Sequence, residues 1–306
     1  MNIKQKIVLL VSKLNPPLGE NNANDISKKR KQAYSFSKLG FLLFDKKVEI
    51  LNKKDAFIEN IPIRIYKNSE KKLQNVILYY HGGGFVFYGL NSHDNVCKRI
   101  CKMNDCIVVS IDYRLAPEHT FPAAHDDAFK AILWARENIE KYGGNPEKII
   151  VAGDSAGGNL AACMAHRCKD ANIPLLAQIL IYPWTDGTIN SPSIHKNATG
   201  YMLTYQNLLW FQKQYTPNPE DHCNPQVSPL HESDFRGLAP AFIATATFDP
   251  LLDDGYNYYK KLEDAGNTCK YVEYKEMIHG FFNIPYMDKR ALQCYYDIQN
   301  FLKDLN

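Results

Sequence analysis

Three short pieces of the chain carry residue types that together could transfer an acyl group to water. They are HGGGF at residues 81–85, GDSAG at 153–157, and an acid and a histidine at Asp249 and His279. In chain order they supply backbone N–H groups for an oxyanion, a serine nucleophile, an acid and a histidine base. Each piece alone could be chance, but all of them in this order and spacing indicate nucleophilic acyl transfer.

Ser155 has the sequence context of a nucleophile elbow. An apolar run at residues 149–152 precedes it and a helical pattern follows it, which predicts a tight strand-to-helix turn. Small residues must flank a serine in such a turn, and Gly153 and Gly157 meet this requirement. We therefore expect the Ser155 hydroxyl at a helix N-terminus, where the helix dipole and the N–H of Ala156 favour negative charge.

The triple glycine predicts an oxyanion hole. It directly follows the apolar run at residues 76–80, and glycines let the backbone approach a substrate closely. We expect Gly83 and Gly84 to donate N–H groups together with Ala156, while Gly82 shapes the turn. An ordinary flexible turn is the alternative interpretation.

Asp249 and His279 are the predicted acid and base. Asp249 comes just after an apolar run at residues 242–245, so that its carboxylate should lie at the carboxyl end of a strand. Asp253 and Asp254 are rivals for the acid, but they open the next helical segment and suit helix capping. His81 is the best alternative base, although its place at the start of the glycine loop favours a structural role.

The segments that must position these residues alternate between strands and helices. Apolar runs predict strands at residues 56–58, 61–66, 76–80, 107–111, 149–152, 179–182, 242–245 and 271–274. Helical patterns fall at residues 93–103, 125–142, 157–169, 253–265 and 288–305. This alternation predicts βαβ units, with helices on both faces of a mostly parallel central sheet. The order Ser–Asp–His is that of the α/β-hydrolase fold.

Two segments do not fit the alternating pattern and are predicted to form a helical cap. Residues 1–50 read as N-terminal cap helices: one is stopped by prolines and a glycine at 15–19, and a second covers about 25–39. Residues 51–306 would form the catalytic domain. Within it, residues 183–240 are too long for a simple crossover and suggest a cap insertion, with a helix near 204–215.

The charge of the chain is uneven. Its net charge is only +3, yet residues 1–75 hold 16 Lys and Arg against 7 Asp and Glu. Nothing in this balance requires a nucleic-acid partner. The run KKRK at residues 28–31 is interpreted as the solvated face of a helix, with a nuclear signal or a contact with an anionic membrane as alternatives.

The eight cysteines contain no C-x-x-C pair and are not accompanied by histidines at zinc spacing. We expect reduced, mostly buried thiols, no metal site, and a cytoplasmic protein. The apolar run at residues 7–11 is too short for a signal peptide, and no stretch is long enough to span a bilayer. The sequence therefore predicts a soluble, unprocessed protein without stable membrane insertion.

From about residue 76 onward, the chain resembles the hormone-sensitive-lipase-like α/β-hydrolases, which include bacterial esterases, plant carboxylesterases and arylacetamide deacetylase. The resemblance rests on HGGGF at 81–85, DYRLAPEH at 112–119, GDSAGGNL at 153–160 and DPL at 249–251. It implies catalysis by Ser155, Asp249 and His279, an oxyanion hole, and a cap built partly from N-terminal helices. We expect residues 113–119 to be a structural loop in which Arg114 pairs with Glu118.

The predicted reaction is hydrolysis of a small carboxylic ester through an acyl-enzyme, with no cofactor. By resemblance, the acyl chain is short to medium. Aromatic residues could line the substrate pocket or pack the cap onto the core equally well; those chosen as substrate-binding candidates are Phe85, Trp184, Tyr205 and Phe211. An amidase or deacetylase, a non-catalytic small-molecule receptor and a membrane-active lipase are the alternatives. A homodimer is also possible.

Overall fold

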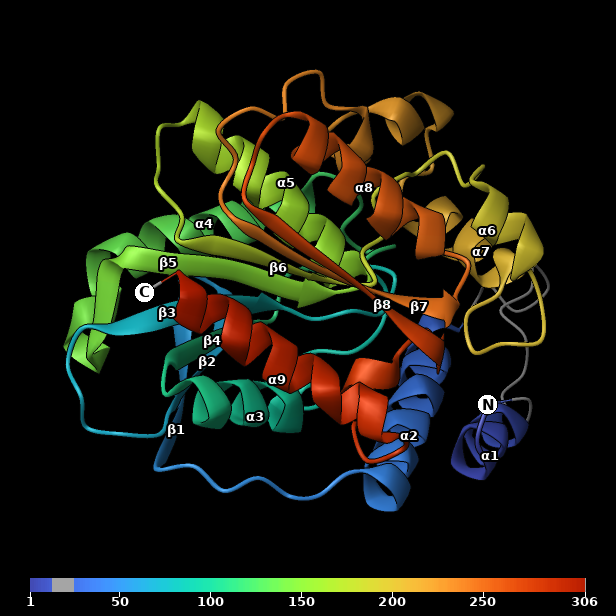
Figure 1. The fold of residues 1–306 in the computed structure, drawn as a ribbon, viewed down its shortest axis with the longest axis horizontal. Helices are drawn as coiled ribbons and strands as arrows, with labels where there is room; N and C mark the ends of the chain where they lie inside the picture. Colours follow the sequence, from blue (N-terminus) through green and yellow to red (C-terminus); the bar gives the residue numbers. More distant parts are fainter. Residues whose placement is uncertain (13–24, 306) are drawn as a thin grey trace.

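An eight-stranded sheet forms the centre of the molecule. The computed structural model describes residues 1–12 and 25–305, and its sheet has the strand order β1-β2-β4-β3-β5-β6-β7-β8 (Figure 1). The strands are β1 (Asn52–Ile58), β2 (Ile61–Lys67), β3 (Gln74–Tyr80), β4 (Ile107–Ile111), β5 (Gly144–Asp154), β6 (Ala177–Ile181), β7 (Ala241–Phe248) and β8 (Cys269–Ile278). Strand β2 is antiparallel to β1 and β4, and the other neighbouring pairs are parallel. The mostly parallel sheet predicted from the sequence is confirmed.

Helices cover both faces of this sheet. One face carries α4 (Ala123–Asn138), α5 (Ala156–Asp170) and α8 (Leu252–Asp264), and the other carries α3 (Asp94–Asn104) and α9 (Lys289–Asp304) (Figure 1). Strand β3 shows why a continuous apolar run suits this position. Its Val76, Leu78 and Tyr80 belong to the core under α4 and α5, while Ile77 and Tyr79 belong to the core under α3 and α9.

The N-terminal segment forms two helices, α1 (Ile3–Ser12) and α2 (Ile26–Phe44). The carboxylate of Asp25 accepts a hydrogen bond from the N–H of Lys28 at 2.8 Å and so caps α2. Val8 and Leu9 of α1 and Phe44 of α2 are buried in the same core cluster as α3 and α9. The predicted stop at residues 15–19 lies outside the described residues.

Residues 183–240 contain two helices, α6 (Pro192–Lys196) and α7 (Tyr205–Tyr215). Thr204 and Asn207 form a capping box at the start of α7, which explains why a helix begins where the sequence predicted one. Short α6 was not predicted, because five residues leave no readable period. Within residues 1–12 and 25–305, no helix combines the length and the apolar character needed to cross a bilayer.

All eight cysteines are free thiols. Six are buried, Cys269 is half-buried, and Cys223 is exposed in a 3-10 turn at Pro219–Cys223. The prediction that most of the thiols are buried is confirmed.

Candidate active site

Ser155 stands at a sharp turn between β5 and α5. Its φ of 57° is in the left-handed region, which is costly for a residue with a side chain. The turn is held by close backbone approaches: a Cβ added at Gly157 would lie 1.9 Å from the carbonyl oxygen of Tyr80, and one at Gly153 would lie 2.3 Å from that of Gly157. Only glycine fits at both positions, as the sequence predicted.

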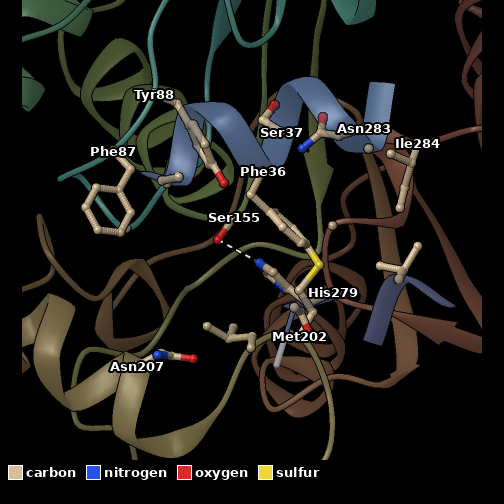
Figure 2. A pocket seen from close by; sticks show the side chains of 18 of the residues that line it. Phe36, Ser37, Phe87, Tyr88, Ser155, Met202, Asn207, His279, Asn283 and Ile284 are labelled. Carbon is tan, nitrogen blue, oxygen red and sulfur yellow. Dashed lines mark hydrogen bonds between the residues drawn. The ribbon is translucent and has the colours of Figure 1, made fainter. Parts of the chain in front are cut away.

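A chain of hydrogen bonds joins Ser155 to the ends of two other strands. His279 Nε2 lies 3.0 Å from Ser155 Oγ (Figure 2). His279 Nδ1 lies 2.7 Å from Asp249 Oδ2. Asp249 follows β7, His279 follows β8, and all three side chains are buried. The N–H of Leu251 donates to the other Asp249 oxygen at 2.9 Å, so the carboxylate is held from both sides.

The alternative candidates for the base and the acid form hydrogen bonds elsewhere. Nδ1 of His81 lies 2.7 Å from the carbonyl oxygen of Gly82, its ring stacks on Tyr113, and burial lowers its pKa to about 3. Asp253 and Asp254 accept hydrogen bonds from the backbone of residues 185–193. The expectation that they cap α8 is wrong, because neither side chain bonds to a free N–H group of their own helix.

The three predicted oxyanion donors lie in the two glycine-rich turns. Gly83 and Gly84 have φ values of 115° and 61°, and Val86 and Phe87 donate N–H groups back to the carbonyl of Gly83. Within the described residues, the N–H groups of Gly83, Gly84 and Ala156 donate to no other protein group. They are therefore available to a ligand.

A buried carboxylate that sequence reasoning did not single out connects these two turns. Asp154 accepts hydrogen bonds from the N–H of Gly82 at 3.0 Å, the hydroxyl of Tyr79 at 2.7 Å and the amide of Asn283 at 3.2 Å, and its Oδ1 lies 3.3 Å from His93 Nε2. Burial alone would raise the pKa of Asp154, but these partners lower it below its usual range. Its place beside Ser155 in GDSAG was the available signal.

The serine and histidine face a cavity of about 640 Å³. Its inner wall contains Gly83, Gly84, Tyr88, Ser155, Tyr182 and His279. Much of the remaining wall comes from the N-terminal helices, including Val8, Leu9, Val11, Phe36, Leu39, Leu43 and Phe44. Figure 2 shows Phe36 of α2 and Met202 close to His279, with Ile284 and Asn283 beside α2.

The four predicted substrate-binding residues divide into two pairs. Trp184 and Phe211 line the cavity. Phe85 does not, because its ring is buried against Tyr215 with the centroids 3.8 Å apart. Tyr205 also lies outside the lining, at the first turn of α7. Aromatic type alone could not separate rings in the cavity wall from rings in the packing behind it.

Two predictions about charged residues are wrong. The KKRK run is not wholly solvated: Lys29 is buried with its Nζ 4.7 Å from the ring centroid of Trp210, and Arg30 pairs with Glu118 at 2.7 Å. Arg30 also donates to the carbonyl oxygens of Val86 and Ala116. Glu118 therefore forms its ion pair with Arg30 of α2, and the expected pair with Arg114 does not form. Arg114 bonds instead to a buried aspartate of α4, Asp127.

Several known proteins with similar sequences or structures are ester hydrolases. The carboxylic ester hydrolase LipN of Mycobacterium tuberculosis is 40% identical over 232 residues, which are 73% of this chain and 61% of LipN. The aligned part thus spans less than two thirds of that relative. The carboxylesterase NlhH of the same species is 41% identical over 242 residues, covering 78% of this chain and 76% of NlhH.

The fold comparison covers almost the whole chain. A hyperthermophilic esterase from the archaeon Pyrobaculum calidifontis superimposes with a TM-score of 0.93 at 34% identity, over 99% of this chain and 98% of the esterase. A family model described as the alpha/beta hydrolase fold matches residues 77–283. The resemblance predicted from the sequence is thereby confirmed, and this chain belongs to the hormone-sensitive-lipase-like family of α/β-hydrolases.

Proposed function

We propose that the protein is a serine carboxylesterase that hydrolyses short- to medium-chain esters. The observation that carries this proposal is the hydrogen-bonded series Asp249–His279–Ser155, which ends at a cavity beside three unoccupied backbone N–H groups. A serine alone is a weak nucleophile. A serine whose proton can pass to a neighbouring imidazole, beside donors for the resulting oxyanion, is equipped for acyl transfer.

In the proposed mechanism, Ser155 Oγ attacks the ester carbonyl carbon while His279 Nε2 takes its proton. Asp249 holds the imidazole in the required tautomer and stabilises the imidazolium. The carbonyl oxygen becomes an oxyanion that accepts hydrogen bonds from Gly83, Gly84 and Ala156. The bond from carbon to the alcohol oxygen then breaks, and His279 donates the proton to the departing alkoxide.

The second half repeats these steps with water as the nucleophile. His279 takes a proton from water as the water oxygen attacks the acyl-enzyme, and it returns that proton to Ser155 Oγ when the acyl–serine bond breaks. The carboxylic acid leaves and the free serine is regenerated. Every proton stays on Ser155, His279, water or a product, so these residues can complete the cycle by themselves.

We also propose that α1, α2 and residues 183–240 act as the cap over this site. They supply much of the cavity wall, with Trp184 and Phe211 as the substrate-contacting aromatics. The mix of apolar walls and few polar groups is typical of small-molecule sites. The eight free thiols support a reducing compartment, and hence a cytoplasmic protein.

The test is hydrolysis of p-nitrophenyl esters from acetate to palmitate. We expect turnover with an optimum at short to medium chains, and a loss in Ser155→Ala of at least about 10⁴-fold in kcat. Ser233→Ala, which alters an exposed serine of a loop, is the matched control and should leave kcat unchanged. An undiminished rate in Ser155→Ala would exclude the proposed mechanism.

The same assay separates an esterase from an amidase. p-Nitroacetanilide carries the same acyl group as p-nitrophenyl acetate but a poorer leaving group. We expect kcat/KM for the ester to exceed that for the anilide. A higher value for the anilide would overturn the esterase proposal in favour of an amidase.

A further inference from the structure

The two N-terminal helices are apolar on the side that faces solvent as well as on the side that faces the core. In the described part of the chain, 13 large apolar or aromatic side chains are exposed, and seven of them belong to α1 and α2. These seven are Ile3, Ile7, Leu10, Tyr34, Leu39, Leu42 and Leu43. Ile3, Ile7 and Leu10 recur at helical spacing along one side of α1, opposite the buried Val8 and Leu9.

Within α1 and α2 themselves, the charged side chains have a single sign. Neither α1 nor α2 contains an aspartate or glutamate, while Lys6, Lys31 and Lys38 are all exposed. Among the residues that the structure describes, none of these three lysines forms an ion pair. Elsewhere on the surface, exposed lysines such as Lys71 and Lys130 are paired with acids. These three lysines thus present positive charge that no acid of the described residues pairs with.

This surface borders the mouth of the cavity. Leu39 and Leu43 are 40% and 53% exposed and also line the cavity, so they are shared between the rim and the outer face of α2. Both helices contribute to the cavity wall and lie on the same side of the sheet (Figure 1). Whatever binds the outer face of α1 and α2 will therefore sit beside the entrance.

We propose that α1 and α2 form a docking surface for the interface of an anionic phospholipid membrane. Apolar side chains fringed by unpaired lysines have the composition of helices that lie in the plane of a bilayer, where the apolar groups enter the acyl boundary and the lysines remain at the headgroups. A helix as short as α1, with 10 residues, can lie at such an interface but cannot span it. The absence of acids in both helices favours a negatively charged surface as the occupant.

Co-sedimentation of the whole protein with lipid vesicles tests this surface. We expect binding to vesicles of phosphatidylcholine with phosphatidylglycerol, weaker binding to phosphatidylcholine alone, and a fall in binding when salt rises from about 50 to about 500 mM. The double variant Ile7→Ser/Leu42→Ser should lower the partition coefficient at least about tenfold. Neither residue lines the cavity, so hydrolysis of soluble p-nitrophenyl acetate should stay unchanged and report an intact fold.

Three further variants test which side chains are responsible for vesicle binding. Phe57→Ser and Leu73→Ser remove exposed apolar side chains from other regions and should leave vesicle binding unchanged. Lys31→Glu/Lys38→Glu keeps the apolar face and should abolish the preference for anionic vesicles. Vesicle binding is also measured with Ser155→Ala. Because this variant is expected to be inactive, its binding tests the docking surface independently of the proposed hydrolysis.

Two outcomes would overturn the proposal. One is equal vesicle binding by the parent and Ile7→Ser/Leu42→Ser. The other is a parent dimer in sedimentation velocity that the same double variant converts to a monomer, with no binding to anionic vesicles. In that case a second copy of the chain, and not a lipid surface, covers α1 and α2.

Discussion

The two walls of the cavity are built differently. Beside Ser155 the wall includes backbone that leaves no room for a side chain: a Cβ added at Gly83 or Gly84 would come within 2.3 Å of a neighbouring atom. On the side of α1 and α2 the wall consists of side chains on helices that have exposed outer faces. There, a Cβ at Gly40 would meet only a methyl group of Ile284, at 3.3 Å.

Because of this difference, we expect one wall to govern the reaction and the other to govern substrate preference. Backbone groups fix the positions of the proposed nucleophile and oxyanion donors, so we expect few substitutions to be tolerated there. We expect that side chains of α1 and α2 can be exchanged without moving the strand ends that hold Ser155, Asp249 and His279. The chemistry and the substrate preference of this enzyme should therefore respond to different mutations.

The largest contrast is expected between two glycine-to-alanine changes. Gly157→Ala places a methyl group 1.9 Å from a carbonyl oxygen, so the elbow must shift, and we expect kcat to fall at least about 100-fold. Gly40→Ala, on α2, should change kcat less than about threefold and stability by no more than about 1 kcal/mol, because improved helix propensity offsets the tight contact. Steady-state kinetics and urea unfolding check both, and similar losses would remove the distinction between the walls.

The pH dependence of the free energy of unfolding should arise from buried histidines next to the central sheet. Burial lowers the pKa of His81 and His125 to about 3 and that of His166 to about 4, so they stay neutral in the folded protein while the unfolded chain binds protons below about 6.5. Burial raises the pKa of Asp254, so this carboxyl binds its proton more readily in the folded protein than in the unfolded chain. Its contribution to the pH dependence of stability therefore has the opposite sign to that of the histidines. Each histidine that gains a proton on unfolding should lower stability by about 1.4 kcal/mol per pH unit between pH 6 and 5, and Asp254 should offset part of the sum.

Urea unfolding across this range measures the slope. His166→Asn removes one of the three histidines and should reduce the slope by about 1.4 kcal/mol per pH unit. Helices α1 and α2 contain no histidine. A slope that persists unchanged in His166→Asn would show that other groups cause the acid sensitivity.

Asp154→Asn should slow catalysis without weakening substrate binding, because Asp154 positions the glycine loop. The substitution keeps the size of the side chain, but its neutral carbonyl oxygen accepts the bonds from Gly82 and Tyr79 more weakly than a carboxylate does. Its NH₂ group cannot accept the bond that Asn283 donates to Oδ2. Because Gly82 leads into the oxyanion loop, we expect kcat to fall about 30-fold while KM stays nearly constant. A variant that is merely unstable would instead lose active protein with kcat per active site unchanged, which titration with an active-site phosphonate would reveal.

The smallest effect is expected at the contact between α2 and the body. Arg30→Met removes the pair with Glu118 and two bonds to backbone carbonyls, but Glu118 is half exposed, so the loss should be about 1–2 kcal/mol. Lys31→Met, on the next residue, should change stability by less than about 0.5 kcal/mol. Hydrogen exchange should show faster opening of α2 in Arg30→Met only. Equal exchange in both variants would mean that α2 is held by its apolar contacts alone.

The sequence predicted those parts of the molecule whose signals are local. The strands were visible as continuous apolar runs, and the elbow was visible because Gly153 and Gly157 must accompany Ser155 within five residues. Partners far apart in sequence were not predictable. Arg30 meets Glu118 across 88 residues, and a chain with 36 basic and 33 acidic residues offers many equally plausible pairs. The burial of Phe85 likewise depends on Tyr215, which arrives from another segment.

The distribution of thiols gives this enzyme a native labelling site. Cys223 is exposed, Cys269 is half-buried, and desolvation raises the pKa of the buried thiols Cys97, Cys101 and Cys294 above that of an ordinary cysteine, so they react slowly. A maleimide fluorophore added in limiting amount should therefore attach first at Cys223, in the same 183–240 segment as Phe211 of the cavity wall. No engineered cysteine is needed to follow, by fluorescence, whether this segment moves when an ester enters.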